Sequence, residues 1–277
     1  MRRVGSWLCG VVAWCVALPL AAQAPAHHEL PPFELPLAAP RQYASYARLL
    51  SVQDPDDRFG PGLQAELAVG ENQPLVRLRG GPSPMSLGVG GAVVGRINMG
   101  DSRTSLVSTD WRFDINANLR FGSRWNVVAF IEHESSHVGD EYVERFGVED
   151  AGWSRDWVGV WGFYEVGPWR AGLNLGAFLG EGSGGLGILV AAAGVDYTGG
   201  ALGWWGRDIR PVLGVYGRVE EQADWRPLLA LRGGLSFPLV NDHRMALLLS
   251  GQTGATHARQ FVGEDLGYLA FEFRFDL

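Results

Sequence analysis

The chain has 277 residues, of which 47% are hydrophobic and 19% are charged. That length fits one or two ordinary domains or a single barrel, and a mean hydropathy close to zero excludes both a disordered chain and a bundle of membrane helices. All 23 basic residues are Arg, against 30 Asp and Glu, which gives a net charge of −7. We therefore expect no nucleic-acid partner, because such a protein needs a basic face.

The N-terminus has the pattern of a secretory signal peptide. Arg2 and Arg3 form a short positive start, and residues 5–22 carry no charge before a run of small residues that suits cleavage. A membrane anchor is the alternative, since about 18 uncharged residues is the lower limit for a helical span. We predict a signal peptide over residues 1–26. Its removal takes away both Cys residues, so the mature chain needs no disulfide.

The rest of the chain divides into a leader and one β domain. Residues 27–42 are rich in Pro, which predicts an extended leader in the periplasm. From residue 43 to 277 no apolar stretch is long enough for a membrane helix, and no segment has the spacing of an amphipathic helix. Apolar and polar residues alternate instead with a period of two, which is typical of strands.

The clearest alternation covers Leu106–Phe121. From residue 107 onward, one face carries only Ser, Asp, Asn and Arg, while the other is apolar apart from one Thr. A strand of this length exceeds the usual length of about 5–6 residues and suits a tilted strand that crosses a membrane. Eleven further segments have the same character and are separated by Gly, Pro, Asn and Asp. They are Tyr43–Ser51, Leu63–Leu78, Met85–Asn98, Trp125–His137, Asp156–Val166, Trp169–Leu179, Ile188–Tyr197, Ile209–Glu220, Trp225–Phe237, Arg244–Thr256 and Leu266–Leu277.

These segments predict an all-β chain, a transmembrane antiparallel β-barrel of about 12 strands with short periplasmic turns and longer extracellular loops. Ten strands are the alternative strand number. A soluble sandwich or lipocalin-like barrel is the competing fold, and it would turn the apolar face inward. Export, the lack of Cys in the mature chain and the strand length favour the membrane barrel.

The last strand carries an independent signal. Leu269–Leu277 alternates apolar and polar residues and ends on an apolar residue, which resembles the segment that outer-membrane barrels present to the barrel-assembly machinery. We therefore expect the protein in the outer membrane of a Gram-negative bacterium, with outer-membrane lipids and the assembly machinery as partners. We expect no cofactor, and a homodimer stays open.

A turn at residues 122–124 fixes the register of the two strands beside it. Phe121 and Trp125 both lie on the apolar face, and partners on neighbouring strands face the same side. Pairing them across a three-residue turn sets four further pairs, which are Arg112 with Glu134, Asp114 with Glu132, Phe113 with His133, and Trp111 with Ser135. The first two pairs face the interior, where we expect a charge network in which Arg112 bridges both Glu residues. The last two pairs face outward.

Residues 133–141 are the one segment that could carry chemistry. His133, Glu134 and His137 match the zinc-protease pattern, but that chemistry needs both His on one face of a helix. The residues before His133 favour a strand, in which residues four apart are separated by roughly 13 Å. One zinc ion cannot span that distance, so we expect no metal site and keep a zinc protease only as a remote alternative.

A second hypothesis is hydrolysis of lipid esters. His133 and Ser135 lie on one face of a strand because side chains alternate, and a Ser nucleophile needs an adjacent base that is itself oriented by an acid or an amide. The H-x-S spacing is similar to that of outer-membrane phospholipase A and lipid A deacylase. This resemblance implies Ser135 as nucleophile, His133 as base and a third member about fourteen residues further on. Gly147 occupies that position and cannot serve, which leaves Glu144, Glu149 or Asp156, and Asp156 is our candidate.

Lipid hydrolysis is the alternative to the function that we predict, a barrel without catalysis that is either structural or a narrow channel. In that case the same residues are the polar end of a strand that enters a charged loop, and the interior charges are paired because burial demands it.

The same segment resembles a bacterial family known only as domain of unknown function 1207. The residues that carry the resemblance are His133, Ser135, Ser136, His137, Gly139, Asp140 and Glu141, with support from residues 219–227 and Ser105–Arg120. The resemblance covers roughly residues 43–277. It implies an exported barrel and brings no activity with it.

Overall fold

The structure is a computed structural model, and it describes residues 33–53, 62–78, 83–100, 104–147, 152–179, 189–203, 208–239, 243–256, 261 and 263–276. The expected signal peptide over residues 1–26 lies outside the described residues. Among those that are described, no helix has the length and apolar character needed to cross a membrane.

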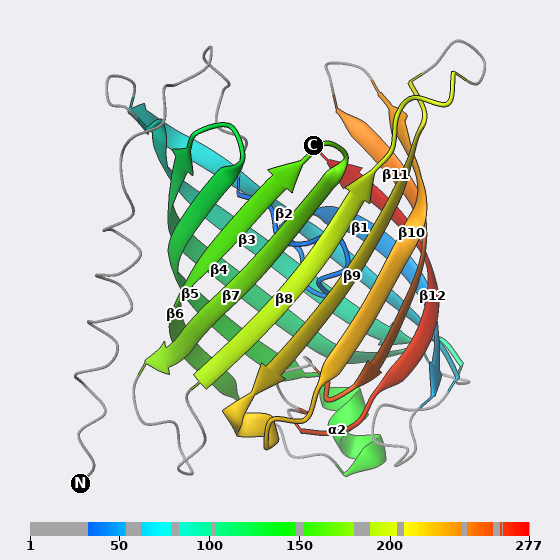
Figure 1. Cartoon of the computed structure of the whole chain (residues 1–277). Helices are drawn as coiled ribbons and strands as arrows, with labels where there is room; N and C mark the ends of the chain where they lie inside the picture. Colours follow the sequence, from blue (N-terminus) through cyan, green and yellow to red (C-terminus); the bar gives the residue numbers. More distant parts are fainter. Residues whose placement is uncertain are drawn as a thin grey trace, which may run out of the picture.

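Twelve described strands form a closed antiparallel barrel, in which each strand pairs with its neighbours in the chain and the first pairs with the last (Figure 1). The strands are β1 Ser45–Gln53, β2 Gly62–Leu78, β3 Met85–Asn98, β4 Ser105–Phe121, β5 Trp125–Val138, β6 Trp153–Val166, β7 Trp169–Leu179, β8 Leu189–Thr198, β9 Arg210–Glu220, β10 Leu228–Pro238, β11 Arg244–Gly254 and β12 Gly267–Asp276. The predicted fold and the strand number of 12 are confirmed, and the alternative of ten strands is wrong.

Two strands start three residues away from the predicted position. β6 begins at Trp153, three residues before the expected start at Asp156. β10 begins at Leu228 instead of Trp225, because the short helix η2, Glu221–Ala223, is followed by two residues with positive φ, 53° at Asp224 and 59° at Trp225. Backbone in that region cannot continue a strand.

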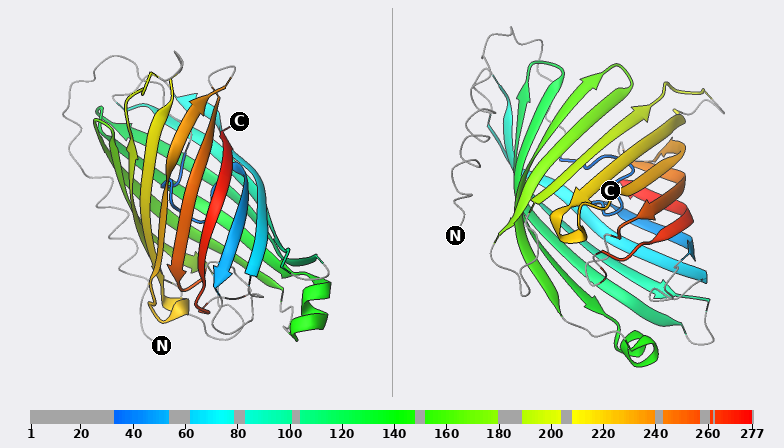
Figure 2. Two further views of the ribbon diagram at one scale, coloured as in Figure 1. Left: turned by 90° about the vertical axis from the view of Figure 1, so that its right-hand side faces the viewer. Right: turned by 60° about the horizontal axis from the view of Figure 1, so that its bottom comes forward.

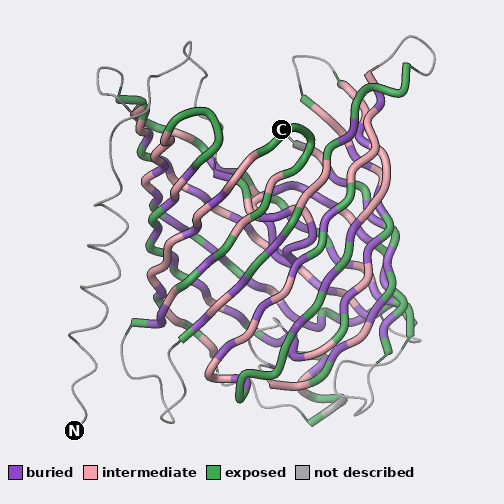
Figure 3. The backbone as a smooth tube through the Cα atoms, in the orientation of Figure 1, coloured by how far each residue is buried: buried purple, intermediate pink, exposed green. Residues whose placement is uncertain are grey.

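The apolar face of the strands points outward. In β4, Ile115 is 54% exposed while its neighbour Asp114 is fully buried, and the same alternation of buried and exposed residues recurs along the other strands (Figure 3). This orientation is that of a membrane barrel and the reverse of a lipocalin-like one.

The two ends of the barrel differ in their connections. One end, here the turn end, carries the turn of residues 122–124 between β4 and β5, which Gly122 closes with a φ of +59°. The opposite end, here the helix end, carries α2, Asp140–Phe146, between β5 and β6 (Figure 1). One connection at the turn end is longer than the short turn expected there, since residues 199–209 separate β8 from β9.

Residues 33–44, here the luminal segment, lie inside the barrel (Figures 1 and 2). Arg232 donates a hydrogen bond to the carbonyl of Leu37 (2.9 Å), and Arg112 donates one to the carbonyl of Arg41 (2.8 Å). The amide of Leu37 in turn donates to Asp196 (2.8 Å). Of the leader expected in the periplasm, residues 27–32 lie outside the described residues, and residues 33–42 lie in the barrel lumen instead. Inward-facing Arg side chains need acceptors, and this segment supplies backbone carbonyls.

Glycines in the wall make room for the luminal segment. A Cβ added to Gly194 in β8 would lie 2.5 Å from Pro36, and one added to Gly214 in β9 would lie 2.8 Å from the Cβ of Leu37. Two cavities beside the segment have volumes of about 20 Å³ each. Such a volume holds roughly one water molecule. The luminal segment therefore fills this part of the barrel interior.

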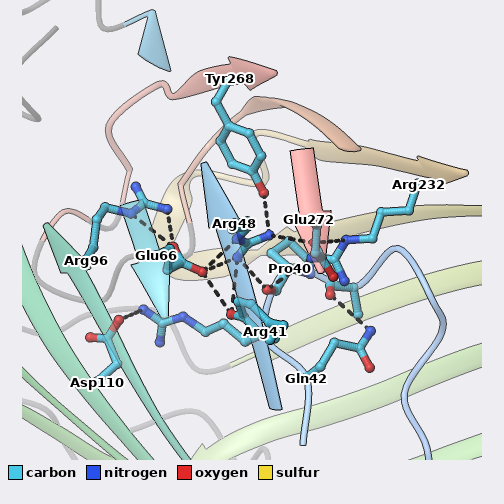
Figure 4. Close-up of polar contacts among 12 residues, drawn as sticks. Pro40, Arg41, Gln42, Arg48, Glu66, Arg96, Asp110, Arg232, Tyr268 and Glu272 are labelled. Carbon is cyan, nitrogen blue, oxygen red and sulfur yellow. Dashed lines mark hydrogen bonds and ion pairs between the residues drawn. The ribbon is translucent and has the colours of Figure 1, made fainter. Parts of the chain in front are cut away.

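A second set of interior charges ties the segment to the first and last strands (Figure 4). Arg48 donates to Glu66 (2.9 Å), to Tyr268 (3.1 Å) and to the carbonyl of Pro40 (3.0 Å). Glu272 of β12 lies 3.7 Å from Arg48. These contacts join β1, β2, β12 and the luminal segment at the point where the barrel closes.

Candidate catalytic site on the outer face

The site is built from two rows of register partners that cross β3 to β6 on the outer face. The first row consists of Gly91, Phe113, His133 and Asp156, and the second consists of Val93, Trp111, Ser135 and Ser154. Both rows lie toward the helix end of β5. The pairing of β4 with β5 is the register expected from the three-residue turn.

His133 contacts an acid on one side and a hydroxyl on the other. Its Nδ1 lies 2.7 Å from Oδ1 of Asp156, and its Nε2 lies 3.5 Å from Oγ of Ser154. With the proton on Nδ1, the imidazole donates to Asp156 and can accept from Ser154. This order of acid, imidazole and hydroxyl is that of a catalytic triad, and catalytic hydrogen bonds are often long before substrate binds.

The two Ser residues of the second row are neighbours across the strands. Ser135, expected as the nucleophile, pairs with Ser154 and is half-buried on the outer face, but the hydroxyl that contacts His133 belongs to Ser154. Sequence reasoning missed Ser154. The signal that could have found it is the spacing, because Ser154 and Asp156 lie two residues apart on one face of β6, as His133 and Ser135 do on β5.

The site is polar although it lies on the apolar outer face of the barrel. The side chains of His133 and Asp156 are 52% and 55% exposed, and the outer face around them is aromatic, with Trp111 and Phe113 each 52% exposed. A single hydrogen bond of this kind contributes only about 0.5–1.5 kcal/mol to stability. The fold therefore gains little from placing these groups among apolar side chains.

The wall behind His133 is held from inside. Arg112 lies 2.6 Å from Glu132 and 3.0 Å from Glu134, the two residues that flank His133. Trp157, which follows Asp156, donates to Glu132 from its indole Nε1 (2.6 Å). Buried contacts on both flanking strands therefore fix the backbone that carries His133 and Asp156.

Two more interior residues complete this cluster. The hydroxyl of Tyr43, in the luminal segment, donates a hydrogen bond to Glu132. This contact links the segment to the inner face of the wall behind His133. Asp114, expected in the same charge network, accepts a hydrogen bond from Asn116 (2.7 Å).

The rest of the sequence motif shapes the end of β5. Ser136 is buried and donates to Asp110 across the lumen side of the wall, while His137 points outward. His133 and His137 both lie in β5, so the helical geometry of a zinc protease is ruled out. Within the described ranges, no group of three or more His, Cys, Asp or Glu side chains is placed to hold a metal ion.

The motif continues into the start of α2. Gly139 has no space for a side chain, since an added Cβ would lie 2.0 Å from the carbonyl oxygen of Leu106. Asp140 and Glu141 occupy the first helical turn, where carboxylates interact favourably with the helix dipole. Gly147 ends the helix with a φ of +62°, so the position fourteen residues beyond His133 serves as a helix cap. Of the acids considered as third members, Asp156 contacts His133, and Glu149 lies outside the described residues.

Fold and outer face together define a twelve-stranded β-barrel of the outer-membrane type. The chain belongs to the family described as protein of unknown function (DUF1207), whose model matches residues 20–277. No curated protein matches the sequence.

Several solved structures share the fold. Outer membrane phospholipase A from Escherichia coli has a TM-score of 0.62 and 14% identity, covering 90% of this chain and 94% of that chain. The Salmonella typhi outer membrane phospholipase, a dimer with bound calcium, has a TM-score of 0.61 and 13% identity, covering 88% and 92%. An active-site variant of the Escherichia coli enzyme, in which an Asn is replaced by Ala, matches with a TM-score of 0.62 and 14% identity, covering 90% and 94%.

Proposed function

We propose that this protein is an outer-membrane acyl hydrolase that cleaves carboxylic esters of phospholipid or lipid A. The observation that carries the proposal is the contact of His133 with Asp156 at 2.7 Å, with a Ser hydroxyl on the other ring nitrogen. The barrel resides in the outer membrane of a Gram-negative bacterium, with the helix end outside the cell. β12 serves as the segment recognised by the barrel-assembly machinery.

The reaction follows from the order of these groups. The Ser Oγ attacks the ester carbonyl carbon while His133 takes the Ser proton on Nε2, and Asp156 stabilises the imidazolium through Nδ1–H. The tetrahedral intermediate collapses, the alcohol leaves with the proton from His133, and an acyl-serine remains. Water then attacks the acyl-serine with His133 again as base, which releases the fatty acid and restores the hydroxyl.

The nucleophile comes from the pair Ser135 and Ser154. The contact distance supports Ser154, whereas the H-x-S spacing shared with outer-membrane phospholipase A supports Ser135. The two are register partners, and Ser135 lies two residues from His133 on the same face of β5. Two single variants separate them.

The phospholipase neighbours add two features to the proposal. One neighbour is a dimer with bound calcium, so we propose a homodimer as the active form and run the assay both with and without calcium. Another neighbour has an active-site Asn, and Asp156 serves here as the group that orients His133.

The test is fatty-acid release by the purified barrel in detergent micelles that contain phospholipid or lipid A. The wild type and a His137→Ala control release fatty acid, while His133→Ala does not. Loss of release in Ser154→Ala but not in Ser135→Ala assigns the nucleophile to Ser154, and the reverse assigns it to Ser135. If the wild type releases no fatty acid from either lipid under any of these conditions, the proposal is wrong and a structural role takes its place.

A narrow channel is less well supported than hydrolysis. The luminal segment occupies the barrel interior, and the cavities beside it are about 20 Å³ each. Solute passage would require residues 33–44 to leave the lumen and to give up their hydrogen bonds to Arg112 and Arg232.

A further inference from the structure

A hollow of about 550 Å³ lies on the outer face of β2 to β5 and reaches His133. Its walls are mainly apolar side chains, and His133 stands at one edge. The outward-facing apolar residues that line it are Val69, Val89, Val93, Trp111 and Phe113. The hollow is therefore continuous with the row that carries the His–Asp pair.

The floor of the hollow exists because one outward position of β3 has no side chain. Gly91 is the register partner of Phe113, which in turn pairs with His133. A Cβ added to Gly91 would meet nothing closer than the carbonyl oxygen of Arg112 at 3.9 Å. With neighbouring strands about 4.8 Å apart, Gly91 lies about 10 Å from His133 along the row.

The far edge of the hollow is polar. Glu71 of β2 pairs with Gly91 and accepts a hydrogen bond from Gln73, and both line the hollow. An apolar floor thus lies between two polar edges, one of them the proposed catalytic His133. A ligand that matches this order has a hydrophobic chain attached to an ester.

We propose that the hollow binds one acyl chain of the lipid whose ester bond faces His133. This inference rests on the proposed function and deepens it by naming the part of the substrate that is recognised. The acyl chain crosses the strands over Gly91, with Trp111 and Phe113 beside it, and this contact positions the ester carbonyl at His133. Phospholipid and lipid A both supply such a chain.

β3 offers a matched control for filling the hollow. Gly95 also faces outward, an added Cβ there meets nothing within 4 Å, and it does not line the hollow. Neither glycine has a positive φ, so both positions accept a side chain. Gly91→Leu fills the hollow, and Gly95→Leu adds the same side chain outside it.

The kinetic test compares palmitoyl and butyroyl esters in micelles. We expect Gly91→Leu to raise KM for the palmitoyl ester by at least about tenfold while kcat/KM for the butyroyl ester stays within about twofold. Gly95→Leu stays within about twofold of wild type for both esters. Equal effects of Gly91→Leu on both esters, or an unchanged KM for the palmitoyl ester, would overturn the proposal.

A binding test separates this inference from the proposed function. The His133→Ala variant is placed in detergent micelles that contain a phospholipid or a lipid A probe. Each probe carries a photoreactive group at the end of an acyl chain. After illumination, the labelled residues are mapped by mass spectrometry. We expect Val89 and Val93, which are partly buried, to be labelled in excess of Leu229 and Leu231, although these two are more exposed, at 54% and 52%, on the outer face of β10. The excess disappears in Gly91→Leu and persists in Gly95→Leu.

The outcomes of the two tests are distinct. Excess labelling together with an inactive wild type supports the hollow as an acyl site and refutes the hydrolase. Uniform labelling of the outer face refutes the acyl site even if the wild type is active. A change of oligomeric state in Gly91→Leu without a change in labelling means that a second copy of the chain covers the hollow, which also refutes the acyl site. Whichever probe gives the excess identifies the lipid.

Discussion

Alternate residues of β5 contrast the inside of this barrel with its outside. Glu132, Glu134 and Ser136 point inward, are buried, and contact charged or polar partners on neighbouring strands. His133 and Ser135 stand between them and point outward among aromatic side chains. The inner residues are paired because burial without partners is costly. Burial does not require polar groups at His133 and Ser135 on the outer face, and we therefore assign the chemistry to these two residues.

Substitutions on the inner and outer faces of the wall should have different effects. Removing an inner partner leaves a buried charge unpaired and lowers stability. Removing an outer polar group leaves the wall intact and changes only what the outer face can do. The inner face of the wall therefore provides stability and the outer face provides chemistry, and this division can be tested on both faces.

The largest expected effect is on catalysis at the outer site. Asp156→Ala should lower the rate of fatty-acid release by about 10³-fold or more, because His133 loses the group that orients it. Asp156→Asn should retain more activity than Asp156→Ala, since an amide oxygen can still accept from Nδ1–H. Initial rates in micelles measure both. Equal rates for the two variants would contradict an orienting role for Asp156.

Arg112→Ala should produce the largest loss of stability among single substitutions behind the site. Arg112 contacts both Glu132 and Glu134, and breaking a buried ion pair costs about 3–5 kcal/mol. His133→Ala, on the other face of the same wall, removes one exposed hydrogen bond and should cost about 0.5–1.5 kcal/mol. Denaturant unfolding followed by heat-modifiable migration on gels measures both, and a smaller loss for Arg112→Ala than for His133→Ala would contradict the division.

The barrel itself could be predicted because its information is local. Every described strand pair except β1 with β12 joins chain neighbours, so period-two alternation and short turns determine most of the structure. The pairing of Phe113 with His133 followed from three turn residues alone. The position of residues 33–42 could not be predicted, because a Pro-rich segment has no period and its Arg donors lie far away in the sequence, at Arg112 and Arg232.

The candidate site was only partly predictable. His133 and Ser135 are visible as a spacing within one strand, and Asp156 was one acid among several. Its place opposite His133 depends on the register of β6, which follows a connection that contains α2 and so cannot be counted across like a tight turn. Ser154 was missed because the predicted strand began at Asp156, whereas β6 begins at Trp153.

The luminal segment tests whether interior contacts also close the barrel. Deleting residues 33–42 removes the carbonyl acceptors of Arg112 and Arg232, and each buried donor left without a partner costs about 1–3 kcal/mol. We expect a less stable barrel that conducts ions across a planar bilayer, whereas the full-length barrel does not. Equal conductance of the two proteins would show that the segment does not block the lumen.

The smallest expected effect comes from two neighbouring Ser residues that face opposite sides of one strand. Ser136 is fully buried and donates to Asp110, a carboxylate that also pairs with Arg41 of the luminal segment. Ser136→Ala removes one hydrogen bond to a buried charge and should cost about 1.5–3 kcal/mol. Ser135→Ala removes a hydroxyl from the outer face and should change stability by no more than about 0.5 kcal/mol. Denaturant midpoints at an unchanged slope measure the difference, and equal midpoints for the two variants would mean that the inner and outer faces of β5 do not divide stability from chemistry.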